Sequence, residues 1–342
     1  MATLRPASGH LAYEFTDVRG VRELPDGRII VVDRGVRAVL WVDPSSGRTG
    51  PIGRQGEGPG EYRYPAFVVS LGLDSSLVVD TQLRRWILLA GDRVVRTMGP
   101  DNDLVRLLGV DIVGADRLGR VASLSGEPPM SYVMRQPTSA QTRFVVTARA
   151  GHLRLDTIGT IRVRRGNTIV RRGTTAYFLR NPLAIDEQSV LMRDGWLAVA
   201  RTSPYRVDWV SPAGVVVAGA HQEVMPRVTE AYKQSAIARE WLVPGYTGPV
   251  WVPTDFPEWP AEMPPFLGSA LMASPEGQLL VERSALASSR GTLVDVFDRS
   301  GSRVRQLQLP ARARIVGFGE RRVYVAQRND DDLETLSIHP WP

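Results

Sequence analysis

The chain is patterned as short apolar runs that end in tight turns. One pair of runs spans Arg28 to Asp33 and Ala38 to Val42, and the same order returns at Leu77 to Asp80 and Trp86 to Leu89. Runs rich in β-branched and apolar residues, bounded by Gly, Asp, Pro and Ser, are typical of short β-strands. Their recurrence along the chain predicts an all-β repeat fold.

The spacing of these units predicts six propeller blades of four strands each. A four-stranded blade takes about 40 to 45 residues. Two intervals are longer, but residues 127–180 hold strand for only one blade, at Arg143 to Ala148 and His152 to Val163. Residues 221–266 instead have the pattern of a helix and a Pro-rich loop. Seven or eight blades is the alternative to a six-bladed β-propeller.

The two ends of the chain are expected to meet in the last blade. That blade has three strands of its own, at Arg314 to Gly317, Val323 to Gln327 and Leu333 to Ile338. Leu11 to Phe15 would add the fourth, outermost strand, because a propeller ring closes when one terminus lends a strand to the other. We therefore expect residues 1–342 to form one domain closed by an N-terminal strand.

Several residues resemble the NHL repeat. The matching segments are Pro65 to Val69, Leu77 to Asp80 and Arg84 to Ile87, and Asp33 with Arg37 repeats the spacing of Asp80 with Arg84. The chain is most similar to bacterial six-bladed β-propeller proteins related to NHL-repeat propellers. The resemblance implies the fold and favours a secreted or periplasmic location. Relatives of this fold include ligand-binding proteins, lactonases, lyases and strictosidine-synthase-like proteins.

The long connections are expected on one face of the propeller. With the strands of a blade lettered A to D from the channel outward, the A–B and C–D turns form the first face. The B–C turns and the D-to-A crossings form the second face. The predicted long connections all fall on the second face: Gly53 to Tyr64, Glu127 to Ala140, Arg164 to Asn181 and His221 to Pro265. Loops on a rigid scaffold commonly carry binding chemistry, so we expect function at the second-face mouth of the channel.

The insertion at 221–266 has two predicted parts. Arg227 to Trp241 has helical spacing of apolar residues and ends before Pro244. Trp251 to Pro260 then interleaves aromatic residues with prolines. The insertion could lie over the channel mouth, or it could pack on a blade edge and shield apolar surface.

Composition excludes some chemistry and favours anionic partners. The chain has no cysteine, which excludes disulfides, zinc thiolate sites and cysteine nucleophiles. Its net charge is +6, and Lys233 is its only lysine among 42 basic residues. A GC-rich genome or selection for bidentate anion contacts would each explain the arginine bias. No apolar run approaches the ~20 residues of a membrane span, and the N-terminus shows no signal-peptide pattern.

The arginine bias suggests a ligand site at the mouth. The expected binding side chains stand near the ends of strands or in the long connections: Arg19, Arg63, Tyr64, Arg106, Arg180, Arg201, Arg314, Arg328 and Trp259. Arginine forks suit a carboxylate or phosphate, so the expected ligand is a small anionic or polar molecule. A protein or peptide on the loop-rich face, or plain solvated arginine, is the alternative. We do not expect the protein to bind nucleic acid. We expect it to be a monomer.

Catalytic candidates are few. Asp33 and Asp80 end B strands and could act as an acid–base pair or bind calcium, or each could accept hydrogen bonds from its own turn. His221 is the histidine placed in a second-face insertion and is a candidate base. No metal-ligand motif occurs, so a calcium or other divalent ion on the channel axis is only a possible cofactor of an enzyme. The glycine run Gly53 to Gly60 has the wrong spacing for a phosphate cradle and opens a strand.

The sequence leaves three functions open. The leading one is a ligand-binding or interaction propeller that uses the arginine-rich mouth. The second is a propeller hydrolase or lyase acting in the same mouth, which needs several polar side chains to converge there. The third is a structural platform for another protein, which predicts a flat, plugged face.

Overall fold

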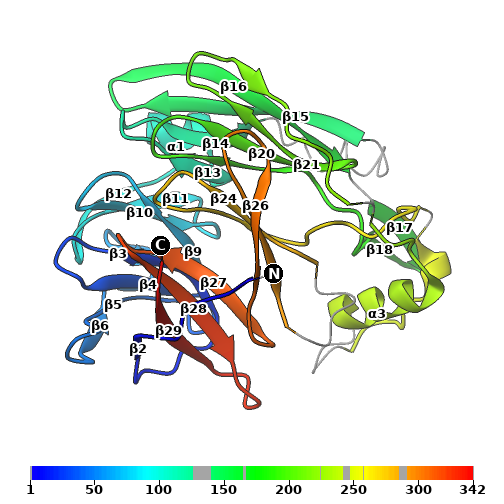
Figure 1. Cartoon of the computed structure of the whole chain (residues 1–342), viewed down its shortest axis with the longest axis horizontal. Helices are drawn as coiled ribbons and strands as arrows, with labels where there is room; N and C mark the ends of the chain where they lie inside the picture. The colour runs from blue at the N-terminus through cyan, green and yellow to red at the C-terminus, as the bar shows by residue number, and fades with distance from the viewer. Residues whose placement is uncertain are drawn as a thin grey trace.

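The computed structural model of the protein describes residues 2–125, 140–164, 167–223, 225–241, 247–256, 258–284 and 291–341. Its main strands form six antiparallel four-stranded blades, and parallel pairing of innermost strands joins blades 3 and 4, and blades 6 and 1, into continuous sheets. Figure 1 shows the blades following one another around the molecule in chain order. The predicted six-bladed β-propeller of four-stranded blades is therefore confirmed. None of the helices in these ranges is long and apolar enough to cross a membrane.

The blades are assembled from consecutive strands. Blades 1 to 3 comprise β3 (Val18–Glu23), β4 (Ile29–Asp33), β5 (Ala38–Val42) and β6 (Thr49–Pro51); β9 (Pro65–Ser70), β10 (Ser75–Asp80), β11 (Arg85–Ala90) and β12 (Arg93–Met98); and β13 (Ile112–Ala115), β14 (Val121–Ser125), β15 (Ala140–Arg149) and β16 (His152–Arg164). Blades 4 to 6 comprise β19 (Gln188–Leu191), β20 (Leu197–Thr202), β21 (Tyr205–Val210) and β22 (Val216–Val217); β23 (Leu271–Ala273), β24 (Leu279–Glu282), β25 (Leu293–Phe297) and β26 (Arg303–Gln308); and β27 (Ala313–Phe318), β28 (Arg322–Arg328), β29 (Glu334–Pro340) and β2 (Gly9–His10).

The remaining elements lie in the connections and at the N-terminus. They are β1 (Ala2–Thr3), β7 (Arg54–Gln55), β8 (Glu61–Tyr62), α1 (Asp103–Leu108), β17 (Asn167–Arg172), β18 (Thr175–Arg180), α3 (Glu230–Trp241) and the 3₁₀ turn η1 (Pro253–Asp255). All those in connections belong to D-to-A crossings, so the predicted asymmetry between the two faces holds there. The predicted long loop from Glu127 to Ala140 falls outside the described residues except at Ala140, where β15 begins.

Apolar packing between neighbouring blades explains the unbroken apolar runs of the B strands. In β4, Ile29 and Val31 pack towards blade 6, whereas Ile30 and Val32 pack towards blade 2. Successive side chains of a strand point to opposite faces, and both faces of a blade are covered by neighbours. All five residues of β4 are consequently buried.

Glycine allows the innermost strands of adjacent blades to touch. Gly317 in β27 lies beside Val21 in β3, and a Cβ at Gly317 would sit 2.1 Å from the carbonyl oxygen of Val21. Gly114 in β13 lies in the same way beside Leu191 in β19. A side chain at either glycine would push the two backbones apart, so these positions hold the blades close to the channel axis.

The predicted closure by an N-terminal strand is confirmed, with a different set of paired residues. Gly9 and His10 pair with β29, opposite Ile338 and Ser337, and Phe15 forms a separate bridge to Glu334. The backbone N–H of Phe15 donates to the carbonyl oxygen of Glu334 at 2.8 Å, and the reverse bond is 2.7 Å. β1 also pairs in parallel with β26, so the N-terminal segment joins blades 5 and 6.

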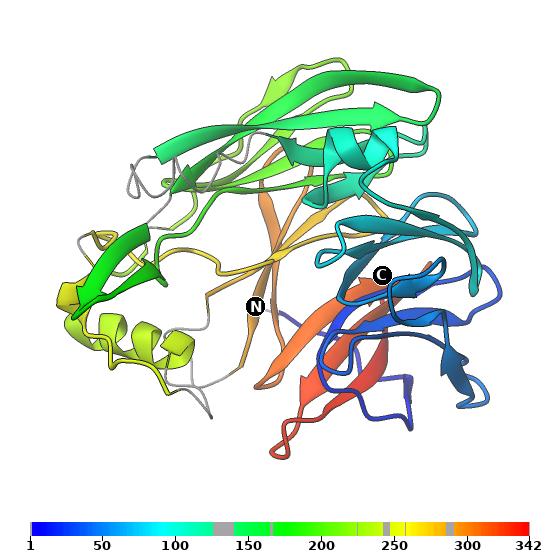
Figure 2. The same ribbon diagram turned by 180° about the vertical axis from the view of Figure 1, so that it is seen from behind.

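Two insertions from different crossings form a satellite structure, which we call the insertion lobe (β17, β18, α3 and η1). Leu179 of β18, Ile237 of α3, and Trp251 and Phe256 beside η1 form its small core. The lobe lies at one edge of the molecule in both views, at the right of Figure 1 and the left of Figure 2. The insertion at 221–266 therefore packs against β18. Its coverage of the channel mouth stays a prediction.

The predicted helix in the insertion is confirmed from Glu230 onwards. It was expected to begin at Arg227, but Arg227 forms a β-bridge to Glu262. The neighbouring N–H of Val228 donates to the carbonyl oxygen of Ala261 at 3.0 Å. A β-bridge requires extended backbone at Arg227, which a helical turn does not have, so the helix begins three residues later.

Replacement of Phe15 tests the closure. Phe15 is 0% exposed between blades 6 and 1, so Phe15→Ala is expected to lower the free energy of unfolding by about 3–5 kcal/mol. Tyr13→Ala is the control, because the Tyr13 ring is 37% exposed and its loss should cost less than about 1 kcal/mol. Urea unfolding followed by tryptophan fluorescence measures both. Equal losses in the two variants would contradict closure through Phe15.

Candidate functional site

Asp33 and Asp80 end their B strands at the second face, as predicted, and both are buried. The carboxylate of Asp33 accepts hydrogen bonds from the backbone N–H groups of Thr16 (2.8 Å), Asp17 (2.9 Å) and Gly35 (3.1 Å). It also accepts the hydroxyl of Thr16 at 2.6 Å. The side chain thus ties the B–C turn to the crossing that enters strand A of the same blade.

Asp80 repeats this arrangement in blade 2. It accepts the N–H groups of Arg63 (2.7 Å) and Tyr64 (3.3 Å) from the crossing. It accepts those of Gln82 and Leu83, both at 3.0 Å, from its own turn. A carboxylate has about four acceptor sites, so these contacts occupy both side chains. The geometry supports the structural interpretation, and a catalytic role for either residue stays a prediction.

In blades 4 and 5 the charge at this position is reversed. Arg201, at the end of β20, reaches Glu187 of the crossing at 2.6 Å and Asp208 of strand C at 2.8 Å. Burial alone would lower the pKa of Arg201, but hydrogen bonds to Asp208 and Glu187 raise it. Arg283, after β24, reaches Asp295 at 2.8 Å in the same way. Arg201 was expected to bind ligand, and the structure shows its donors engaged by these carboxylates.

The richest charged cluster spans blades 6 and 1. Its members, which we call the mouth arc, are Asp17, Arg19, Arg34, Arg314, Arg328 and Glu334. Three of the predicted ligand residues, Arg19, Arg314 and Arg328, therefore come together. They stand in different strands and meet because blade 6 is built beside blade 1 when the ring closes.

Glu334 is the buried anchor of the mouth arc. It is 0% exposed and accepts Arg314 at 2.7 Å, Arg328 at 2.9 Å and the backbone N–H of Val18 at 2.8 Å. Burial alone would raise the pKa of Glu334, but the hydrogen bonds from Arg314 and Val18 and the charge of Arg314 lower it. The carboxylate is therefore ionised at neutral pH and fixes the two guanidinium groups.

Asp17 occupies the more open side of the arc. It lies 2.9 Å from Nε of Arg19 and 2.8 Å from Nε of Arg34, with Arg314 and Arg328 at 3.6 and 3.8 Å. Burial alone would raise the pKa of Asp17, but the charges of Arg19 and Arg34 outweigh that effect and lower it. Its Oδ1 atom is buried and lacks a hydrogen bond of good geometry.

The arc retains positive charge and donors. Four arginines against two carboxylates leave a net charge of +2. The side chains of Arg19 and Arg34 are 38% and 33% exposed, and each meets Asp17 through Nε. Their terminal Nη groups have no hydrogen-bond partner within the described ranges. An anion arriving from solvent could accept these N–H groups.

The other predicted binding residues lie outside the arc. Arg63 pairs with Glu57 at 2.7 Å, and Arg180 pairs with Asp186 at 3.2 Å. Tyr64 lies under the guanidinium of Arg37, and Trp259 packs inside the insertion lobe. The last of them, Arg106, pairs with Asp103 on α1. His221, the predicted catalytic base, is an exposed residue in the crossing from blade 4 to blade 5.

Sequence reasoning missed Asp17, Arg34 and Glu334. Asp17 precedes Arg19 by two residues, and alternation along a strand could have placed the two side chains together. A second signal was available, because charged residues inside apolar C strands recur as Asp208, Asp295 and Glu334. A buried charge needs a partner, so each of these predicts a nearby arginine.

The glycine run from Gly53 to Gly60 encloses a side chain of its own protein. The guanidinium of Arg85 donates to the carbonyl oxygens of Gly56 (3.2 Å), Glu57 (2.9 Å) and Gly58 (3.2 Å). A phosphate cradle presents N–H groups, which is the opposite polarity. The prediction that this run is a crossing and not a phosphate site agrees with that geometry. A shallow hollow of about 460 Å³ lies beside it, between the glycine run and β12.

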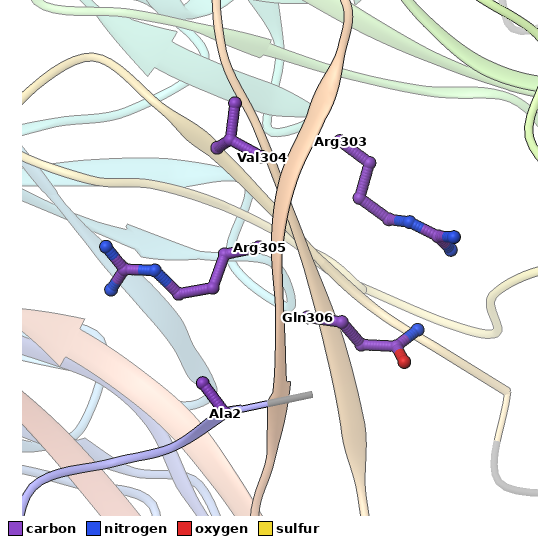
Figure 3. Close-up of a pocket in the computed structure, with 5 residues that line it drawn as sticks. All are labelled: Ala2, Arg303, Val304, Arg305 and Gln306. Carbon is purple, nitrogen blue, oxygen red and sulfur yellow. The ribbon is translucent and has the colours of Figure 1, made fainter.

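A second hollow, of about 300 Å³, lies on the outer strand of blade 5. Figure 3 shows Arg303 and Gln306 pointing to one side of β26, and Arg305 to the other. The strand register shifts between Arg303 and Arg305, which explains why these two side chains diverge. Arg303 and Gln306 are directed to the buried carboxylate of Asp295, at 3.5 and 2.8 Å. This hollow is formed by outer-strand residues and includes no member of the mouth arc.

Within the described residues, no group of three or more His, Asp or Glu side chains is placed to hold a metal ion. Asp33, Asp80, Asp17 and Glu334 instead face N–H and guanidinium donors. Such donors repel a cation, so these carboxylates do not fit an axial calcium.

No protein family model and no curated protein sequence matches the chain. Solved structures resemble it over nearly its whole length. A calcium-binding regucalcin from Agrobacterium tumefaciens is 12% identical, with 100% of this chain and 98% of that one covered and a TM-score of 0.41. A putative gluconolactonase is 13% identical (98% and 94% covered, TM-score 0.48), and a streptogramin B lyase 10% (97% and 86%, TM-score 0.43). This likeness concerns the propeller fold alone, and the closer relation to NHL-repeat propellers stays a prediction.

Asp33→Asn and Asp80→Asn test the structural role of the two aspartates. An amide replaces one acceptor by a donor that faces backbone N–H groups, so each variant should lose about 1–3 kcal/mol of unfolding free energy. Asp331→Asn, on the exposed turn after β28, is the control and should change stability by less than about 0.5 kcal/mol. Urea unfolding at pH 7 measures all three. If Asp33→Asn and Asp80→Asn lost no more unfolding free energy than Asp331→Asn, the structural role of the two aspartates would be contradicted.

Acid unfolding tests Glu334. Its lowered pKa means that its contribution is fully present above the pKa of an unfolded glutamate, about 4.3, and is lost as the pH falls through the folded value. Glu334→Gln should lower the unfolding free energy at pH 7 by about 3 kcal/mol, because Arg314 and Arg328 lose their buried partner. Its stability should also fall less than that of the wild type between pH 5 and pH 3. If the unfolding free energies of wild type and Glu334→Gln fell equally between pH 5 and pH 3, the role assigned to Glu334 would be contradicted.

Proposed function

We propose that this protein binds a small carboxylate-bearing anion at the mouth arc. The observation that carries the proposal is the convergence of four arginines on two carboxylates, with Nη donors of Arg19 and Arg34 left over. The arc lies at the loop-rich second face, where B strands end and A strands begin. This narrows the ligand-binding function expected from the sequence to one place on the molecule.

Guanidinium geometry favours a carboxylate or phosphate as the ligand. The planar fork offers two parallel N–H groups, and charge-assisted bonds to an anion are about twice as strong as neutral ones. In the unliganded protein Asp17 supplies the anionic charge between Arg19 and Arg34. A ligand carboxylate would add to this charge or displace Asp17, whose poorly bonded Oδ1 atom is the least fixed acceptor of the arc.

Calcium does not fit the same residues. The regucalcin that shares the propeller fold is described as a calcium-binding protein, but the carboxylates here are already opposed by arginine and N–H donors. The hydrolase or lyase alternative needs a free acid or base at the mouth. The two acids predicted for this role, Asp33 and Asp80, are occupied by hydrogen bonds, so their contacts do not support this alternative. His221 as a base stays a separate prediction.

Isothermal titration calorimetry with succinate and with inorganic phosphate tests the proposal. We expect saturable binding at low ionic strength that weakens with salt, because partly exposed charges are screened. Arg19→Gln combined with Arg34→Gln should weaken binding at least tenfold, or about 1.4 kcal/mol. Asp17→Asn should strengthen it roughly three- to tenfold, since it removes the competing carboxylate.

The control removes the same charge elsewhere. Arg96→Gln with Arg171→Gln takes two exposed arginines from β12 and β17 and leaves the arc intact. Binding by this double variant should stay within about twofold of the wild type. Equal weakening in both double variants would mean that only net charge attracts the anion, and the proposed site would be wrong.

A further inference from the structure

Glu282 stands beside the mouth arc and has no role in the contacts described so far. It is the last residue of β24, and its N–H donates to the carbonyl oxygen of Ala270 at 2.9 Å. Its side chain is half-buried, and no hydrogen bond or ion pair to its carboxylate occurs among the residues that the structure describes. A carboxylate that is partly withdrawn from water and has no protein donor is available to a cationic group of a ligand.

Strand alternation places this carboxylate on the side of blade 6. Leu279 and Val281 of β24 pack towards blade 4, whereas Leu280 packs towards blade 6. Glu282 lies two residues after Leu280 and therefore shares its face. The second residues of the next two A strands are Arg314 in β27 and Arg19 in β3.

The pKa of Glu282 agrees with this placement. Burial raises the pKa of Glu282, and the positive charges of Arg314 and Arg19 oppose that rise without cancelling it. Arg314 and Arg19 are themselves held by Glu334 and Asp17 and form no ion pair with Glu282. Glu282 thus lies on the side of β24 that faces blade 6, as an acceptor without a donor among the described residues.

We propose that the ligand of the mouth arc is dipolar, with an anionic group held by the arginines and an ammonium group held by Glu282. This inference rests on the proposed anion site and specifies its ligand class. An amino acid or the terminus of a peptide carries these two groups close together. An ammonium donates three hydrogen bonds and would pair with the half-buried carboxylate of Glu282, which a dicarboxylate without an ammonium group cannot do.

Aspartate and succinate form a matched pair of probes, because they differ by one ammonium group. Titration of each into the full-length protein at pH 7.5 should show aspartate binding about tenfold more tightly than succinate. The lower net charge of aspartate alone would favour the opposite order at a positive site. A preference for aspartate would therefore report a contact to its ammonium group.

Glu282→Gln tests whether Glu282 is that contact. The preference for aspartate should fall from about tenfold to below twofold, while succinate affinity changes by less than threefold or improves. Glu320→Gln, an equal charge change on an exposed first-face turn, should keep the preference. Thermal unfolding of both variants checks that each is folded.

The outcomes separate this inference from the proposed function. Succinate binding that depends on Arg19 and Arg34, with no preference for aspartate in the wild type, would overturn the dipolar ligand and leave the anion site standing. A preference that survives Glu282→Gln would overturn the assignment of Glu282. Failure of both probes to bind would overturn the anion site and, with it, this inference.

Discussion

A polar contact where the B strands of blades 1, 2, 4 and 5 meet the crossings into their blades is the constraint on which the second face depends. Crossing residues outside any strand have no ladder partners, so their backbone N–H and C=O groups need side chains to satisfy them. Asp33 and Asp80 accept N–H groups in blades 1 and 2. In blades 4 and 5 the corresponding residues are Arg201 and Arg283, which donate to Glu187 and to the carbonyl oxygen of Pro265 in their crossings. The polarity changes around the ring, but the position of the contact is kept.

This constraint explains much of the arginine content without reference to a ligand. Arg85 is enclosed by carbonyl groups of the glycine run, and Arg201 is held between two acids. Such residues are fixed by the fold, and a change at any of them acts first on stability. The mouth arc differs because blades 6 and 1 meet there and bring four arginines to two carboxylates. The closing of the ring there gathers more cations than the contacts to the crossings need, so the Nη groups of Arg19 and Arg34 remain available.

Local sequence patterns were sufficient to predict the repeat. They did not predict elements whose position depends on contacts between residues far apart in the sequence. The B strands read as unbroken apolar runs because neighbouring blades cover both of their faces, as for β4. The helix of the insertion was predicted, but its start was not, since Arg227 bridges to Glu262 far along the chain. The hairpin of β17 and β18 was missed within an expected crossing. Its apolar residues gain a partner only when α3, about 50 residues later, packs on them.

The candidate site, too, was predicted in part from local sequence patterns and in part depends on long-range contacts. The sequence by itself determined the six-bladed architecture, the closing role of the N-terminal segment and the arginines at the starts of strands, because alternation and turn chemistry are local. It could not determine which arginines are free, since that depends on which acid each one meets. Arg201 ends a B strand and Arg314 begins an A strand, both at the second face, but Arg201 is held between two acids, whereas Arg314 shares Glu334 with Arg328. Only the tertiary structure, by placing Asp17 of the crossing into blade 1 and Glu334 of blade 6 around the same arginines, decided where charge is left for a ligand.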